Sequence, residues 1–334
     1  MIHRTIPTWQ ARSWQDELSQ LITEPEALFT ALKLDPSHLE AAKRATSLFP
    51  LRVTQSFVNR MKLGNINDPL LLQVLPLREE FNRHPGYTTD PLEEADSNPV
   101  PGLIHKYHSR VLLIGAPQCA INCRYCFRRH FDYQANTPSR AQWLDALGYI
   151  RSTPEIDEVI LSGGDPLVTS DRQLAWLIDE LAAIPHLQRL RIHSRLPIVL
   201  PSRVTPELVN ILTSSRLQPV LVVHCNHPQE LDSEVESAFE LLRNQGITLL
   251  NQTVLLKCIN NDAETLIQLS KELFKLGVLP YYLHLLDKVE GTTHFDQNER
   301  DAKRLHSAML AHLPGYLVPK LVREDAGATS KTPV

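Results

Sequence analysis

Three cysteines, Cys119, Cys123 and Cys126, constrain this chain more than any other feature, because their spacing is C-x3-C-x2-C. They follow the apolar run 111–114, which reads as a β-strand. Cysteine thiolates hold the irons of iron–sulfur clusters, so three of them suit three irons of a four-iron cluster and leave the fourth iron open. The alternatives are loose core thiols or a zinc site with His130 as the fourth ligand, although zinc usually takes four ligands from paired C-x2-C units.

Composition indicates a folded protein of a reducing compartment. The chain has 334 residues, of which 43% are hydrophobic, and a net charge of -4, which gives no sign of general attraction to nucleic acid. Its five cysteines are too few and too clustered for a disulfide framework, and Cys225 and Cys258 read as buried core thiols. No apolar stretch could cross a membrane, and Met1 to Pro7 lacks a signal-peptide run. We therefore expect a cytoplasmic protein without a membrane or nucleic-acid partner.

The chain divides into two parts by pattern. Residues 1–96 read as a helical N-terminal extension: apolar residues recur at helical spacing from Trp14 to Ile22, and Pro25 and Pro36 each lie near the start of a short helix. Turn-forming residues then lead to a boundary near residue 96. We expect this extension to pack on the outside and to hold no catalytic group, and residues 97–334 to form the core.

Strand-like and helix-like runs alternate six times in the core, which predicts parallel strands joined by helical crossovers. Ser139 and Gln142 form a capping box, and Thr205 precedes a proline at a helix start. The expected strands are 111–114, 159–161, 190–193, 220–223, 247–250 and 281–286. The expected helices start at Ser139 and Thr205 or carry apolar stripes over 174–181, 231–242, 266–276 and 302–309. A doubly wound sheet and a barrel both satisfy this α/β pattern.

Polar residues gather where these strands end, and in either fold the chemistry lies at the carboxyl ends of strands. After the cysteine loop, these are Gly163, Gly164 and Asp165, then Ser194 and Arg195, then residues 224–227, and finally Asp287. Glycines can expose backbone groups to a close ligand, although a plain strand-to-helix turn is the simpler explanation.

The cysteine spacing, with Tyr125 before the last cysteine, resembles the signature of radical S-adenosylmethionine (SAM) enzymes. The resemblance implies a partial (β/α)6 barrel and a four-iron, four-sulfur (4Fe-4S) cluster whose open iron binds SAM. It also implies that Gly163, Gly164 and Asp165 hold the methionine part of SAM. We expect Tyr125, Ser194 and Arg195 to contact a cofactor as well.

Longer segments resemble the lysine 2,3-aminomutase family, and they cover the chain from about residue 100 to its end. These segments are 126–131, 161–167, 192–197, 224–228, 250–256 and 281–284. The helical front and short length look most like the branch that serves elongation factor P. The resemblance implies conversion of free L-lysine to β-lysine, which a separate lysyl ligase attaches to the factor. It also implies an external reductant such as flavodoxin, and it allows a homo-oligomer.

Family chemistry requires pyridoxal 5'-phosphate (PLP) bound as a Schiff base to a lysine. Lys331 lies in a segment similar to the family's glycine-rich segment, although only one glycine of the run is present; Lys320 is the rival. Tyr107 is expected to stack on the cofactor ring, and Lys106 or Arg110 to pair with its phosphate. A plain basic surface turn is the alternative for that segment.

The resemblance also names three substrate contacts. Arg128 matches the arginine that binds the substrate carboxylate, and Asp287 and Glu324 match two acids that receive its distal ammonium. Better-known members have aspartate where Glu324 stands, so the ammonium would shift. Solvated surface carboxylates are the alternative. Alternative functions are a catabolic aminomutase for lysine or another basic amino acid, and a non-catalytic iron–sulfur or zinc protein.

Overall fold

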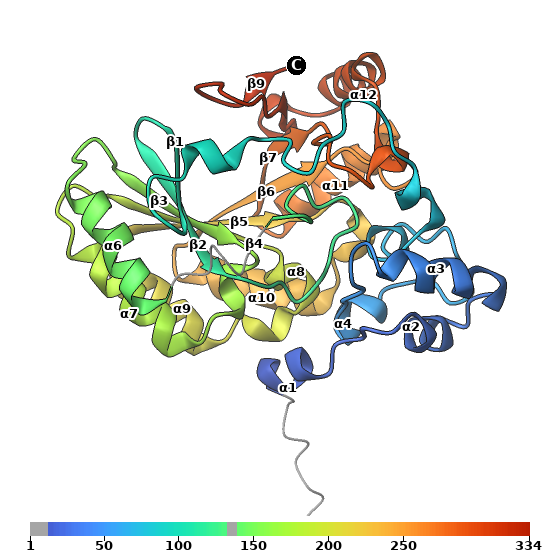
Figure 1. The fold of residues 1–334 in the computed structure, drawn as a ribbon, viewed down its shortest axis with the longest axis horizontal. Coiled ribbons are helices and arrows are strands. Elements are labelled where there is room, and N and C mark those ends of the chain that lie inside the picture. Colours follow the sequence, from blue (N-terminus) through green and yellow to red (C-terminus); the bar gives the residue numbers. More distant parts are fainter. Residues whose placement is uncertain (1–12, 132–138) are drawn as a thin grey trace, which may run out of the picture.

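The computed structural model describes residues 13–131 and 139–334, so the expectation for Met1 to Pro7 lies outside the described residues. A single sheet of nine strands, in the order β1 to β9, forms the centre of the molecule (Figure 1). Its strands are β1 Leu103–Tyr107, β2 Arg110–Ala116, β3 Glu158–Gly163, β4 Arg189–Ser194, β5 Gln218–His224, β6 Thr248–Val254, β7 Leu279–His284, β8 Lys320–Arg323 and β9 Thr332–Pro333.

Strands β2 to β8 run parallel to their neighbours, while β1 and β9 pair antiparallel at the two edges. The sheet keeps the order of the chain, as a barrel does, whereas a doubly wound sheet reverses its order at a switch point. All six expected strands are present in β2 to β7, and a helix follows each of them. The expected partial (β/α)6 barrel is therefore confirmed.

The helices of the barrel begin where the sequence predicts helix starts. The Ser139 backbone amide donates to Gln142 Oε1 at 2.8 Å, and the Gln142 amide donates back to Ser139 Oγ at 3.3 Å. Thr205 caps the helix that starts at Pro206. The helices are α6 Arg140–Arg151, α7 Asp171–Ala182, α8 Leu196–Val199, α9 Pro206–Thr213, α10 Ser233–Asn244, α11 Ala263–Lys275 and α12 Glu299–His312.

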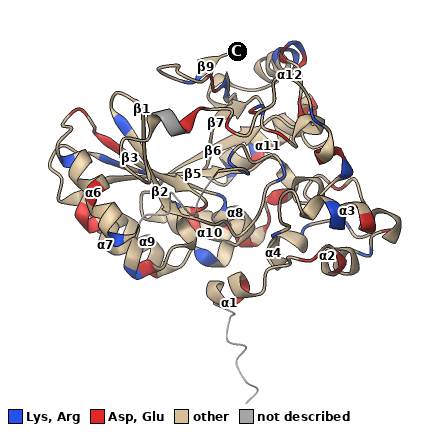
Figure 2. Cartoon of the chain, viewed as in Figure 1, with Lys and Arg blue, Asp and Glu red and all other residues tan. Residues whose placement is uncertain are grey.

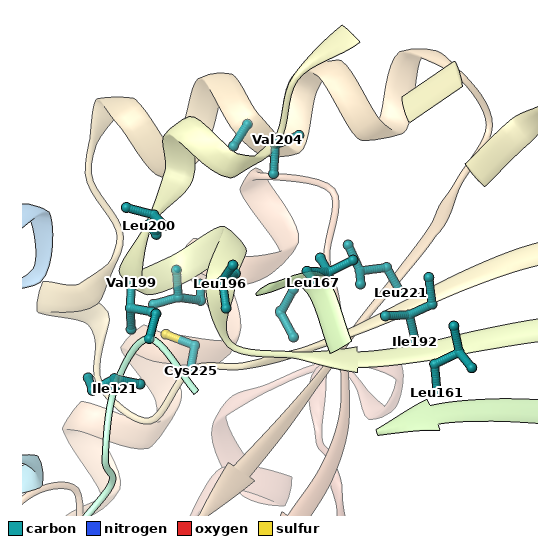
Figure 3. Packing of buried hydrophobic residues seen from close by; sticks show 14 of the residues in the cluster. Ile121, Leu161, Leu167, Ile192, Leu196, Val199, Leu200, Val204, Leu221 and Cys225 are labelled. Carbon is teal, nitrogen blue, oxygen red and sulfur yellow. The ribbon is translucent and has the colours of Figure 1, made fainter. Parts of the chain in front are cut away.

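Successive residues of the strands face opposite sides of the sheet. Leu161, Ile192 and Leu221 form one row across β3, β4 and β5, and they belong to the main hydrophobic cluster (Figure 3). In the neighbouring row, Ile160 pairs with Arg191, and both line an internal cavity. The sheet therefore has an apolar face toward the helices and a partly polar face toward the cavity.

The N-terminal extension is built of short helices beside the barrel (Figure 1). They are α1 Trp14–Ser19, α2 Pro25–Leu32, α3 Leu39–Thr46 and α4 Gln55–Val58, with 3-10 turns at Pro36–His38, Leu71–Gln73, Arg78–Phe81 and Glu94–Ser97. Trp14 and Phe57 of the extension belong to the same hydrophobic cluster as the barrel strands. Both signs of charge are interspersed over the outer helices (Figure 2). Among the described helices, none combines the length and the apolar character needed to span a bilayer.

Two expectations about local structure are wrong. Helix α1 ends at Ser19, and Ile22 forms a β-bridge with Val53 instead of continuing the helical pattern. Cys258 is exposed at a left-handed backbone position, with φ at 66°, whereas Cys225 is buried as expected. The segment around Lys106 is strand β1, which pairs with β2, so the alternative of a plain basic surface turn does not apply to Lys106.

Candidate active site

A cavity of about 700 Å³ lies inside the barrel, and all of the predicted site residues line it. Strand ends, the cysteine loop and the C-terminal segment each contribute to its wall. The predicted residues on the wall are Cys119, Cys123, Cys126, Tyr125, Arg128, Lys106, Tyr107, Arg110, Gly163, Gly164, Asp165, Ser194, Arg195, Asp287, Glu324 and Lys331. Residues separated by more than 200 positions in the chain therefore share one site.

The three cysteine thiols lie close enough to affect one another. Burial, then the charge of neighbouring groups that include the other cysteines, raises the pKa of Cys119 well above its usual value. The same causes raise the pKa of Cys126 to about 12. In the described part of the chain, no three His, Cys, Asp or Glu side chains surround one ion-sized position, although all three cysteines line the cavity. His130, the fourth ligand of the zinc alternative, is exposed outside the cavity lining, and its Nε2 lies 3.4 Å from the Glu290 carbonyl oxygen.

The two glycines after β3 allow the cysteine loop to approach closely. A Cβ atom on Gly164 would lie 2.5 Å from the Gln118 carbonyl oxygen, and Gly163 has φ at +114°. The Gly164 amide donates to the Ala116 oxygen and the Asp165 amide to the Gln118 oxygen, both at 3.0 Å. The Gly164 amide therefore holds the loop, and the expectation that these glycines hold the methionine part of SAM stays a prediction.

Asp165 joins the ends of β3 and β4. Its carboxylate accepts hydrogen bonds from Ser194 Oγ at 2.7 Å, from the Arg195 amide at 2.7 Å and from the Leu196 amide at 3.1 Å. Burial raises the pKa of Asp165 to about 6, although these hydrogen bonds oppose the shift. Asp165 thus sets the position of Ser194 and Arg195 on the wall.

Arg195 connects the cysteine loop to the N-terminal extension. Its Nη1 lies 2.8 Å from Cys123 Sγ, and its Nη2 donates to Gln73 Oε1 at 2.6 Å and to Glu230 Oε2 at 3.2 Å. The Cys123 sulfur therefore faces a buried guanidinium at the cavity wall. Sequence reasoning missed Gln73, since it lies in a short irregular segment without a recognisable pattern.

Lys331 is held at the cavity wall and is not a solvated tail residue. Its Nζ lies 2.5 Å from Glu324 Oε2, and Tyr107 donates to Glu324 Oε1 at 3.3 Å. Burial alone would raise the pKa of Glu324. The positive charges of Lys331, Lys106 and Arg128 together outweigh burial, so the pKa of Glu324 is lowered. Lys320, the rival for the cofactor lysine, is exposed in β8 and is outside the cavity lining.

Asp287 carries its charge less readily than Glu324. Burial first, and then repulsion from the Glu324 carboxylate, raise the pKa of Asp287 to about 7. The Lys331 ammonium opposes this shift. The two acids that were predicted to receive a substrate ammonium are thus electrostatically coupled on one wall of the cavity.

Arg128 forms a buried ion pair with a residue of the N-terminal extension. Its Nε and Nη2 donate to the two carboxylate oxygens of Glu94, each at 2.7 Å, and its Nη1 lies 3.5 Å from Ser162 Oγ. Glu94 also lines the cavity. The extension therefore contributes Glu94 to the cavity wall, while the expectation that it holds no catalytic group stays a prediction. No sequence signal could have found Glu94, because it lies among turn residues without periodicity.

Three half-buried histidines complete the cavity. His193, His224 and His284 lie on β4, β5 and β7, and within the described residues their Nε2 atoms have no hydrogen-bond partner. Burial lowers the pKa of His224 to about 4 and lowers the pKa of His193 and of His284 well below its usual value, so the rings are neutral at pH 7. His224 was among the polar residues predicted at strand ends, whereas His193 and His284 appeared only inside longer segments that resemble the family. Buried polar atoms without a partner usually signal a missing ligand, so this wall suits a polar one.

Comparison with known proteins gives the family. No family model matches the chain. The chain is 50% identical to the L-lysine 2,3-aminomutase of Escherichia coli over 99% of this chain and 96% of that protein. It is 49% identical to the L-lysine 2,3-aminomutase of Haemophilus influenzae, over 97% and 96% of the two chains. A radical SAM methyltransferase from Sphaerobacter thermophilus aligns with a TM-score of 0.45 and 15% identity, over 66% of this chain and 68% of the other. Since half of its residues match over nearly its whole length, the chain belongs to the lysine 2,3-aminomutase family.

Proposed function

We propose that the protein is an L-lysine 2,3-aminomutase that uses a 4Fe-4S cluster, SAM and PLP to convert free L-lysine to β-lysine for the modification of elongation factor P. The observation that carries this proposal is that one cavity holds both the three cysteines and Lys331. A thiolate set and a lysine amine are the attachment points of the two unlike cofactors that such an isomerase needs.

The residues of the cavity fit both cofactors. The three thiols on one wall suit a cluster, because cysteine sulfurs hold its irons, and the Arg195 guanidinium lies beside the Cys123 sulfur. Lys331 and the three histidines with unpartnered Nε2 atoms suit a polar, aromatic cofactor such as PLP. When bound, the cluster and SAM supply a 5′-deoxyadenosyl radical, and PLP stabilises the radical through which the amino group shifts.

The charges on the wall suit a substrate with a carboxylate and a distal ammonium. Arg128 offers a guanidinium for the carboxylate, while Asp287 and Glu324 attract the ammonium. Glu324 already pairs with the Lys331 ammonium, so a substrate ammonium that takes Glu324 competes directly with Lys331. Two acids at the distal end disfavour glutamate as a substrate; measuring turnover of lysine, arginine and ornithine would separate the basic candidates.

The proposal also states what the β-lysine is used for, namely the modification of elongation factor P. It is supported by the resemblance of the helical front to that branch of the family. We also propose a cytoplasmic location and an external reductant such as flavodoxin. Deleting the gene tests this role: elongation factor P should then lack β-lysine, whereas an unchanged factor together with failure to grow on lysine would favour a catabolic aminomutase.

Two substitutions test the cofactor assignments. After anaerobic reconstitution, Cys126→Ala should abolish lysine isomerisation and lower the iron content. Lys331→Ala should remove both the activity and the visible absorbance of the bound PLP. Lys320→Ala is the matched control, since that lysine is exposed outside the cavity, and it should keep both. Full aminomutase activity in either of the first two variants would reject the assignment. One zinc per chain without SAM cleavage would favour a binding protein instead.

A further inference from the structure

The segment from Tyr87 to Glu94, here called the strap, crosses from one side of the cavity to the other. Thr88 pairs with the loop after β7: its amide donates to the Lys288 oxygen, and its own oxygen accepts from the Glu290 amide, both at 3.0 Å. Tyr87 donates to Asp296 Oδ2 at 2.7 Å. The strap is thus fastened beside Asp287 at one end, and its other end reaches Arg128.

Glu94, at the far end of the strap, has the geometry of an orienting group. Only 5% of the residue is exposed, and both carboxylate oxygens are engaged by Arg128 at 2.7 Å. A two-point contact fixes the plane of a guanidinium, whereas a single hydrogen bond would let it rotate. The Nη1 atom is directed to Ser162 at the end of β3, which also lines the cavity.

The strap also restrains the second cation on this wall. Lys106 Nζ donates to the Leu92 carbonyl oxygen at 3.0 Å and lies 3.8 Å from Glu94 Oε1. Glu94 therefore faces both cations of this wall, and Lys106 also lies 3.9 Å from Glu324 Oε1.

We propose that Glu94 is a positioning residue for Arg128, and that it fixes the guanidinium in the orientation that receives the substrate carboxylate. This inference rests on the proposed function, because it assumes that the substrate is an amino acid. Glu94 contributes to substrate binding through Arg128, and it takes no part in the chemistry of the amino shift.

The test compares Glu94→Gln with Glu93→Gln in the reconstituted holoenzyme. Gln keeps the shape of Glu94 but places an N–H against the guanidinium, while Glu93 is the exposed neighbour on the same segment. We expect Glu94→Gln to raise the KM for L-lysine by about 10- to 100-fold, the range of one charge-assisted hydrogen bond, with kcat changed less than about threefold. Glu93→Gln should leave both constants unchanged.

L-Lysinamide gives a readout that a purely structural role would not produce, because it keeps both amines and lacks the carboxylate. Its inhibition constant should be the same, within about twofold, in the wild type and in Glu94→Gln. The proposal would be overturned if Glu94→Gln weakened the binding of lysine and of lysinamide equally, or if it left the KM for lysine unchanged. A lower KM would also overturn it, since that would mean that Glu94 competes with the substrate carboxylate for Arg128. Should Glu94→Gln fail to fold, as judged by its melting temperature, Glu94→Asp carries the test, since it keeps the charge but shortens the reach. A wild-type enzyme that does not turn over lysine would instead reject the proposed function.

Discussion

At the scale of single residues, the charge on Asp287 determines when the cavity can receive a cation. Burial and the neighbouring Glu324 carboxylate raise the pKa of Asp287 to about 7, so the group is neutral below this pH and negative above it. Only the negative form attracts an ammonium strongly. Glu324 differs, because Lys331 keeps its pKa below the usual value, and it is charged throughout the neutral range.

We therefore expect the KM for L-lysine to fall as the pH rises from about 6 to about 8, since Asp287 loses its proton over this range. Asp287→Asn should have a higher KM at pH 8 and should lose this dependence. Steady-state kinetics at a series of pH values measures both effects. If the variant shows the same pH dependence as the wild type, another group is responsible, and Asp287 does not receive the ammonium.

At the scale of elements, the approach of the cysteine loop to β3 depends on Gly164. A Cβ atom there would lie 2.5 Å from the oxygen and 2.6 Å from the nitrogen of Gln118, and both are backbone atoms that cannot rotate away. Gly164→Ala should therefore displace the start of the loop and lower the iron content after anaerobic reconstitution. Destabilisation of about 1–3 kcal/mol should accompany this loss, as expected for overpacking.

Gly148→Ala is the matched control for that substitution. Gly148 lies in α6, and among the described residues no other part of the fold comes within 4 Å of the place that a Cβ atom would take there. Replacing a helical glycine by alanine should leave the iron content unchanged and stabilise the fold by about 0.5–1 kcal/mol. Iron analysis and thermal melting measure both variants, and equal iron loading in the two would show that the loop tolerates the side chain of Ala at position 164.

The sequence predicted the elements that have a long apolar pattern or a cap formed by neighbouring residues. Strands β2 to β7 carry apolar runs, and the capped helices carry stripes, so each element is visible in its own residues. Strands β8 and β9 have only four and two residues, which is too short for a pattern. Strand β1 is polar at its end and depends on pairing with β2. Ile22 likewise takes its conformation from Val53, a distant partner.

At the scale of the whole molecule, some site residues were predictable from their own part of the sequence, and others depend on distant parts of the chain. Cys119, Asp165 and Asp287 were predictable because a parallel strand places its carboxyl-terminal residue at the cavity, whatever the rest of the chain does. Glu94 and Gln73 were not predictable, since they reach the cavity only after irregular segments have packed across the barrel. Such contacts are decided by tertiary packing and leave no local periodicity.

Glu80 provides the clearest case of a residue that joins the two parts of the chain. It is buried in the extension, and its carboxylate accepts from Arg124 Nε at 2.8 Å, from Arg124 Nη2 at 2.5 Å and from Arg129 Nη2 at 2.7 Å. These arginines flank Cys126, and Arg129 also reaches the Gly291 oxygen at 3.3 Å. One carboxylate therefore connects the extension, the cysteine loop and the loop after β7.

Glu80→Ala would leave two guanidinium groups buried without their carboxylate, which typically costs about 3–5 kcal/mol of unfolding free energy. The exposed neighbour Glu79 is the matched control, and Glu79→Ala should change stability by less than about 0.5 kcal/mol. Urea unfolding followed by tryptophan fluorescence and by far-ultraviolet circular dichroism measures both variants. Because Trp14 shares a hydrophobic cluster with the barrel strands, both signals should shift to one lower midpoint. Two separate transitions would mean that the two parts of the chain unfold independently, and an unchanged midpoint would mean that water replaces the lost carboxylate.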